Sequence, residues 1–105
     1  MPKLPLCPLD ELEPGSARRF DVAGQPIAVI RIGDDVYAIG DICSHQNISL
    51  SEGEVDPDER TVECWKHGSA FSVETGEALT LPATRPVPVY DVRVDDGQIV
   101  VVFDD

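Results

Sequence analysis

The sequence predicts an all-β fold, a small antiparallel β-sandwich or barrel. Short runs rich in β-branched residues recur along the chain and are separated by turn residues, a pattern typical of small β domains. Nine prolines and eight glycines disfavour long helices. Only residues 9–15 have helical character, and this stretch is too short to define the fold. With 105 residues, the chain is expected to form a single domain, residues 1–105.

The expected strands are joined by tight turns. Gly33-Asp34-Asp35 separates two of them, and Thr75-Gly76 is expected at the centre of a hairpin. Asp96-Gly97 is typical of a two-residue hairpin turn, because Gly accepts the positive φ that such a turn requires. The β-rich segments are 17–24, 25–32, 36–40, 72–79, 87–94 and 98–104.

The chain is strongly acidic, with 20 Asp and Glu residues, 8 Lys and Arg residues and a net charge of −12. This charge argues against nucleic acid and against an anionic membrane as partners. It suits either solubility alone or a basic protein partner. No apolar run approaches the roughly 20 residues of a membrane helix, and the N-terminus lacks the apolar core of a signal peptide. We therefore expect a cytoplasmic protein whose cysteines stay reduced.

Four of the chain's five Cys and His residues fall in two short clusters, Cys43-x-His45 and Cys64-x-x-His67. Eighteen residues separate His45 from Cys64. Both clusters lie in loops between predicted strands, so residues 41–71 are expected to form a loop-rich insertion on a β framework. Cys and His together are good ligands for zinc or iron, and the sequence therefore predicts a metal centre.

Two kinds of centre fit these ligands. A structural zinc site would use two Cys and two His, but zinc fingers place a Cys pair before a His pair. Here each cluster holds one Cys and one His. A [2Fe–2S] cluster explains this mixture better, because each loop then supplies one ligand to each iron. A zinc-stabilised interaction module and a redox-sensing or iron-sensing domain remain alternatives.

The two clusters resemble the cluster-binding boxes of Rieske iron–sulfur proteins. Gly68 after the last His, the segment FSVETGEAL at 71–79 and the segment LPATRPVPVYDVRV at 81–94 extend this resemblance over residues 3–104. The match is to small soluble Rieske-type ferredoxins, such as the ferredoxin component of bacterial ring-hydroxylating dioxygenase systems. The resemblance implies the Rieske fold: an antiparallel β base formed by residues 3–40 and 86–104, with a small loop-rich cluster-binding subdomain at 41–85.

The resemblance also implies the cofactor and its ligands, one Rieske-type [2Fe–2S] cluster. Cys43 and Cys64 would hold the inner iron, and His45 and His67 the outer iron. The loop that contains Pro82 would shield the cluster. Because two neutral His replace two charged Cys, the reduction potential is expected in the range of about −150 to +300 mV.

The implied function is one-electron transfer rather than catalysis. The chain would accept electrons from a reductase and pass them to an oxygenase, such as a ring-hydroxylating dioxygenase, or to another redox enzyme. A nitrite-reductase-like system and an iron–sulfur assembly context are alternatives. The sequence contains no phosphate loop and no dinucleotide fingerprint, and its serines have no spare His to activate them.

Residues around the second box are expected to tune the potential. In high-potential members of the family, a Ser and a Tyr after the final His donate hydrogen bonds to cluster sulfurs. Here Ser69 is present, but Phe71 occupies the Tyr position. Ile48 and Lys66 occupy the positions of a disulfide found in respiratory and photosynthetic members, so that bond cannot form. We therefore expect a potential in the lower part of the Rieske range.

Three further residues carry expectations. Trp65 and Lys66 flank His67 and could lie at a docking face, although Trp65 is expected first as a packed aromatic anchor of a short loop. Cys7 lies far from both boxes in sequence and is expected as a small core residue.

Overall fold

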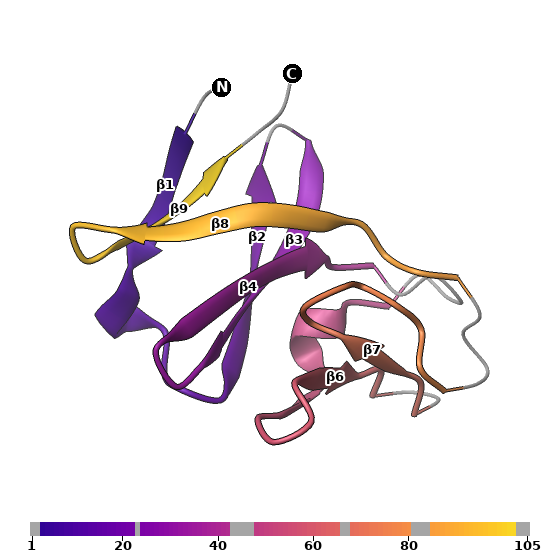
Figure 1. Ribbon diagram of the computed structural model, residues 1–105. Coiled ribbons are helices and arrows are strands. Elements are labelled where there is room, and N and C mark those ends of the chain that lie inside the picture. Colours follow the sequence, from indigo (N-terminus) through magenta and orange to yellow (C-terminus); the bar gives the residue numbers. More distant parts are fainter. Residues whose placement is uncertain (1–2, 23, 43–47, 66–67, 81–84, 103–105) are drawn as a thin grey trace.

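The computed structural model describes residues 3–22, 24–42, 48–65, 68–80 and 85–102. These residues form two antiparallel sheets, a six-stranded sheet in the order β1-β9-β8-β4-β3-β2 and a three-stranded sheet in the order β5-β6-β7 (Figure 1). Two short 3₁₀ turns, η1 and η2, complete the described elements. The strands are β1 (Lys3–Pro8), β2 (Ser16–Val22), β3 (Gln25–Ile32), β4 (Asp35–Gly40), β5 (Glu54–Asp56), β6 (Thr61–Glu63), β7 (Ala70–Ser72), β8 (Val89–Asp95) and β9 (Gln98–Val102), and the turns are η1 (Leu9–Glu11) and η2 (Leu50–Glu52). The predicted all-β class is confirmed.

The predicted hairpin turn at Asp96-Gly97 is present. Asp95 pairs with Gln98 across β8 and β9, and Asp96 and Gly97 both have positive φ, 52° and 77°. Two consecutive positive φ angles are the signature of a turn whose twist matches that of the strands it joins.

Strand β1 was not among the strands expected from the sequence, and neither were the short strands β5 and β6. Strand β1 contains Pro5 and Pro8, which lack the N–H group that a central strand needs. In the structure β1 lies at the edge of the six-stranded sheet and pairs with β9 alone, in a ladder with an irregularity between Pro5 and Cys7. An edge strand tolerates proline because one side of it needs no partner.

Strand β3 is buried on both faces and separates two hydrophobic cores. Ile27 and Val29 face the first core, which also contains Cys7, Leu12, Val22, Ala38, Ile99 and Val101. Ala28, Ile30 and Ile32 face the second core, which also contains Ile39, Leu50, Val62, Cys64, Phe71, Val73 and Val87. Successive side chains of a strand point to opposite faces, so one apolar strand serves both cores. The second core attaches the three-stranded sheet to the larger one.

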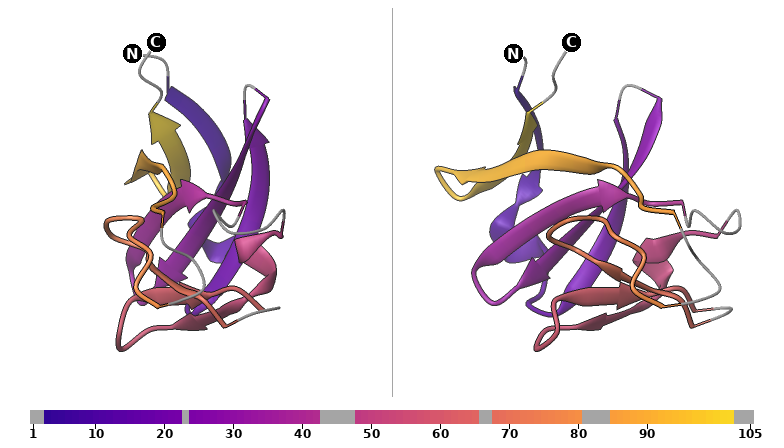
Figure 2. Two further views of the ribbon diagram at one scale, coloured as in Figure 1. Left: turned by 90° about the vertical axis from the view of Figure 1, so that its right-hand side faces the viewer. Right: turned by 45° about the vertical axis from the view of Figure 1, so that its right-hand side comes forward.

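The two sheets occupy different ends of the molecule. Figure 1 and both views of Figure 2 place β6 and β7 away from β1 and β9.

Cys7 is buried in the first core, in agreement with its expected role, and burial raises the pKa of its thiol above the ordinary value of 9.0. Within the described part of the chain, no helix has the length and apolar composition that a membrane crossing requires.

Candidate metal centre

Cys64, the first residue of the second Cys/His box, directly follows β6 in the β6–β7 hairpin. Glu63 and Ala70 form its last strand pair, and the loop continues the pairing through the Cys64 N–H, which donates to the Ser69 carbonyl oxygen at 2.7 Å. The Gly68 N–H donates back to the Cys64 carbonyl oxygen at 2.9 Å, with Gly68 at φ 75°. Cys64 is a free thiol that is only 1% exposed. Lys66 and His67 lie outside the described residues.

The described ends of the first box lie close together. Cys43 and His45 fall outside the described residues, but Ile42 and Ser49 on either side form a β-bridge. The Leu50 N–H also donates to the Asp41 carbonyl oxygen at 2.5 Å. The chain therefore returns to the end of β4 directly after the box and enters η2.

A buried carboxylate joins the two ends of the first box. Asp41 is fully buried, and its side chain accepts a hydrogen bond from the Ser49 hydroxyl and another from the Ser51 N–H at 2.9 Å. Arg19 forms an ion pair with it, and its guanidinium nitrogen lies 3.7 Å from Asp41 Oδ2. The sequence analysis missed this group, because an Asp and two Ser residues form no recognisable motif at these spacings.

Thr80 ties the start of the proline-containing loop to the second box. Its hydroxyl oxygen accepts a hydrogen bond from the Ala70 N–H at 2.8 Å and donates one to the Gly68 carbonyl oxygen at 3.4 Å. Pro82 lies outside the described residues, two positions after Thr80. The sequence analysis also missed Thr80, since a single Thr in a loop gives no local signal.

Two glycines allow backbone segments to approach closely at the same end of the molecule. A Cβ added to Gly53, just after η2, would lie 1.8 Å from the carbonyl oxygen of Glu63, the residue before Cys64. A Cβ added to Gly76 would lie 2.2 Å from the Val87 carbonyl oxygen. Only glycine fits such contacts, so the return from the first box packs directly against the strand that leads to the second.

The residues expected around the second box differ in burial. Ser69 and Phe71 are both fully buried, and Phe71 packs in the second core opposite Val62. Trp65 is 57% exposed, so the prediction that it packs as an apolar anchor is wrong. The reason is local: Cys64 points into the core, and the next residue of this hairpin turn points outward.

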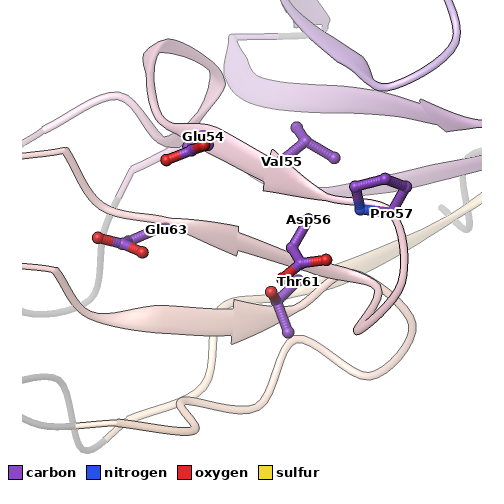
Figure 3. A pocket seen from close by; sticks show the side chains of 6 residues that line it. All are labelled: Glu54, Val55, Asp56, Pro57, Thr61 and Glu63. Atoms are coloured by element: carbon purple, nitrogen blue, oxygen red, sulfur yellow. The ribbon is translucent and has the colours of Figure 1, made fainter.

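Carboxylates surround the exposed Trp65. A shallow pocket of about 330 Å³ is lined by Trp65, Glu52, Gly53, Glu54 and Glu63. A second pocket of about 300 Å³, shown in Figure 3, is lined by Glu54, Val55, Asp56, Pro57, Thr61 and Glu63. Glu54 and Glu63 are direct partners across β5 and β6, so two like charges face each other. In the described ranges, no three His, Cys, Asp or Glu side chains are grouped closely enough to hold a metal ion.

The donor chemistry of the described part of the centre fits an iron–sulfur cluster. Cys64 offers a reduced thiol on the buried side of a hairpin turn, and iron–sulfur clusters are bound by cysteine thiolates. The backbone bonds within residues 64–69 fix the direction of that side chain. The other three predicted ligands, Cys43, His45 and His67, lie outside the described residues.

Comparison with known proteins identifies the family. The family model of the Rieske [2Fe-2S] domain matches residues 3–91. The 3-phenylpropionate/cinnamic acid dioxygenase ferredoxin subunit of Escherichia coli K12 is 43% identical over 99 residues, which cover 94% of this chain and 92% of that protein.

Two solved structures have the same fold. The ferredoxin of carbazole 1,9a-dioxygenase from Nocardioides aromaticivorans IC177 superposes with a TM-score of 0.94 at 39% identity, covering 97% of this chain and 98% of that one. A ferredoxin in the complex of reduced oxygenase and oxidized ferredoxin in carbazole 1,9a-dioxygenase gives 0.89 at 40% identity, covering 95% and 92%. From the family match and these near-complete alignments, the chain belongs to the Rieske [2Fe-2S] domain family.

Proposed function

We propose that this chain is the ferredoxin component of a ring-hydroxylating dioxygenase system, carrying one electron at a time from a reductase to an oxygenase. The observation that carries this proposal is the near-complete alignment with dioxygenase ferredoxins at 39–43% identity. The chain covers 92–98% of those proteins, so the alignment spans nearly the whole of each carrier. It is an electron-transfer protein and not itself the catalytic enzyme.

We infer that Cys43 and Cys64 bind one iron of a single [2Fe–2S] cluster and that His45 and His67 bind the other. The bound cluster would supply a one-electron redox centre in the Rieske potential range. The chain's own residues would direct the ligands: the Cys64–Ser69 and Gly68–Cys64 backbone bonds orient the second box, and Thr80 connects it to the Pro82 loop. Ser69, which is fully buried and follows His67 by two residues, would donate a hydrogen bond to a cluster sulfur.

This ligand set gives the two parts of the chain different roles. Residues 41–85 would act as the cluster-binding subdomain, mounted on a base formed by residues 3–40 and 86–104. The second core supports this arrangement, because residues from β3 and β4 pack there against Leu50, Cys64 and Phe71. The base would hold the loops in place while the cluster changes charge.

The acidic surface beside Trp65 suits a basic protein partner. Glu52, Glu54 and Glu63 surround the exposed indole, and the whole chain has a net charge of −12. Opposite charges steer association, and salt screens that attraction. Trp65 and its neighbour Lys66 would lie at the docking face for the reductase or the oxygenase. We infer a cytoplasmic carrier that has no nucleic acid or membrane partner.

Reconstituted electron transfer tests the proposal. The purified chain is mixed with a dioxygenase reductase, NADH and a Rieske-type oxygenase, and oxygenase reduction is followed by visible absorbance. We expect reduction that requires this chain and slows as salt rises. A parallel assay with a nitrite-reductase catalytic subunit tests the main alternative. Electron delivery there but not to any oxygenase would refute the assignment, and a colourless protein with one zinc ion would refute the electron-carrier role altogether.

A further inference from the structure

We propose that Asp41 is a positioning residue for the first ligand loop: its buried carboxylate clamps the two ends of that loop, and the Arg19–Asp41 pair sets the charge beside it. The proposal rests on the proposed function, in which Cys43 and His45 bind the cluster. Asp41 precedes Cys43 by two residues, and Ser49 follows His45 by four.

Asp41 holds both sides of the loop by itself. Its N–H donates to the Pro26 carbonyl oxygen at 3.1 Å, which fixes it to β3. Its carbonyl oxygen accepts from the Leu50 N–H, and its two carboxylate oxygens accept from Ser49 Oγ and the Ser51 N–H. The side chain and backbone of one residue therefore connect the framework to residues 49–51.

The complete burial of the Asp41 carboxylate makes these hydrogen bonds energetically important. A carboxylate removed from water is costly unless hydrogen bonds and an opposite charge compensate it. Here both oxygens are hydrogen-bonded, and the Arg19 guanidinium lies 3.7 Å from Oδ2. Such a satisfied network favours one arrangement of the chain over others. The loop ends are thus held together by protein contacts, and less order remains to be imposed when the ligands bind.

The charges of the clamp predict opposite effects on the cluster. Adding an electron makes the cluster more negative, so a nearby carboxylate opposes reduction and a nearby guanidinium favours it. Asp41→Asn keeps the shape of the side chain and an acceptor for the Ser51 N–H, while the Ser49 hydroxyl can turn to accept from the new amide. This substitution removes the negative charge with little loss of the clamp. Arg19→Gln removes the positive charge, although Arg19 also pairs with Asp21 at 3.1 Å.

The first test measures how fast the intact holoprotein loses its cluster to excess EDTA, followed by visible absorbance. Asp41→Ala should accelerate the loss by about tenfold or more, the factor for roughly one lost hydrogen bond to a charged group. Ser49→Ala should lie between this variant and the wild type. Ser51→Ala keeps the backbone N–H that donates to Asp41 and removes only the hydroxyl that contacts Ser49 Oγ at 2.8 Å, so its acceleration should be smaller than that of Ser49→Ala.

Two control variants separate positioning from general stability. Asp21→Ala removes the exposed carboxylate that shares Arg19 and should leave the rate unchanged. Val101→Ala makes a cavity in the first core and should lower Tm without accelerating cluster loss at temperatures where the protein stays folded. An acceleration in Val101→Ala equal to that in Asp41→Ala, or no acceleration in Asp41→Ala and Ser49→Ala, would overturn the clamp.

The second test measures reduction potentials by protein-film voltammetry at fixed pH and salt. Asp41→Asn should raise the potential and Arg19→Gln should lower it, whereas a merely structural role would move both in one direction or neither. Asp21→Asn is the control for the second contact of Arg19. Shifts of the same sign would overturn the electrostatic part. A wild-type protein without a cluster would instead refute the proposed function, so the two failures can be told apart.

Discussion

The six-stranded sheet and the three-stranded sheet are held together by different means. β2 and β3 pair over seven residues each, and β3 is buried on both faces. Strands β5, β6 and β7 have three residues each. Around them the structure relies on single contacts: the Asp41 carboxylate, the Thr80 hydroxyl and the close approach at Gly53. The larger sheet thus depends on repeated pairing, and the smaller one on a few specific residues.

This difference matters for how the molecule carries its cofactor. A small sheet of short strands is marginal by itself and needs packing or ligands to stay ordered. The second core supplies the packing, and in our proposal the cluster supplies the rest, since metal binding is coupled to folding.

Removing the cluster should loosen the small sheet and spare the large one. Acid treatment with a chelator, or the substitution Cys64→Ala, removes the metal or one of its ligands. Amide hydrogens of β6, β7 and residues 48–53 should then exchange at least about tenfold faster, while those of β3 and β9 keep their protection. Hydrogen–deuterium exchange of holoprotein and apoprotein measures this. Equal loosening of both sheets would show that the two regions are a single cooperative unit.

Among the glycines whose φ is negative and open to any residue, Gly53 should be the one whose replacement by Ala is most destabilising. Gly53 has φ −84°, which any residue adopts, so its cost comes from the new Cβ meeting the Glu63 carbonyl oxygen. We expect a loss of roughly 3 kcal/mol in the free energy of unfolding, the upper range for overpacking. Gly15→Ala, in the turn that precedes β2, is the control. It has φ 81° with no atom within 4 Å and should lose about 1 kcal/mol through backbone strain alone. Urea denaturation compares the two, and equal losses would remove the role of the close approach.

The sequence analysis predicted the large sheet better than the small one, and the reasons are physical. Residues 25–32 are apolar because β3 is buried on both faces, and Asp96-Gly97 carries its turn chemistry locally. The small sheet has strands too short to show a period. Trp65 was misplaced because composition does not reveal which way a turn residue points.

The contacts that hold the ligand loops escaped the sequence analysis for a related reason. Asp41 and Ser51 meet across ten positions, as do Ala70 and Thr80. Such pairs become visible only when the chain is folded. The ligand pattern itself could be recognised in the sequence, because Cys and His are rare in this chain and fall in two clusters. The placement of Cys43, His45 and His67 remains a prediction from the family pattern.

Thr80→Val should weaken the link between the second box and the proline-containing loop. Valine keeps the shape of threonine but neither accepts from Ala70 nor donates to Gly68. We expect the free energy of unfolding to fall by about 1 kcal/mol, because the contact is exposed, and we expect a modest acceleration of cluster loss. Thr75→Val is the matched control, because the Thr75 hydroxyl accepts one hydrogen bond within a turn, from Glu77 at 3.3 Å. If the two variants lose their clusters at the same rate, Thr80 has no special role.

Ser69→Ala should act mainly on the reduction potential. A hydrogen bond to a cluster sulfur favours the reduced state by roughly 1–1.4 kcal/mol, so its loss should lower the potential by about 40–60 mV. Phe71→Tyr should raise the potential if its hydroxyl reaches a sulfur, but the fully buried Phe71 leaves little room for relaxation. Protein-film voltammetry measures both, with a wild-type value expected below about 0 mV. A wild-type value near +300 mV, or no shift in Ser69→Ala with the cluster intact, would contradict this tuning.

The central claim is that this chain carries a single electron on a cluster bound by two Cys and two His. Quantitative EPR of the purified protein, before and after reduction with dithionite, tests it most directly. We expect no signal in the oxidised protein and a rhombic signal of about one spin per chain after reduction, the behaviour of one Rieske-type [2Fe–2S] centre. A protein that stays EPR-silent after reduction while binding one zinc ion per chain would contradict the account.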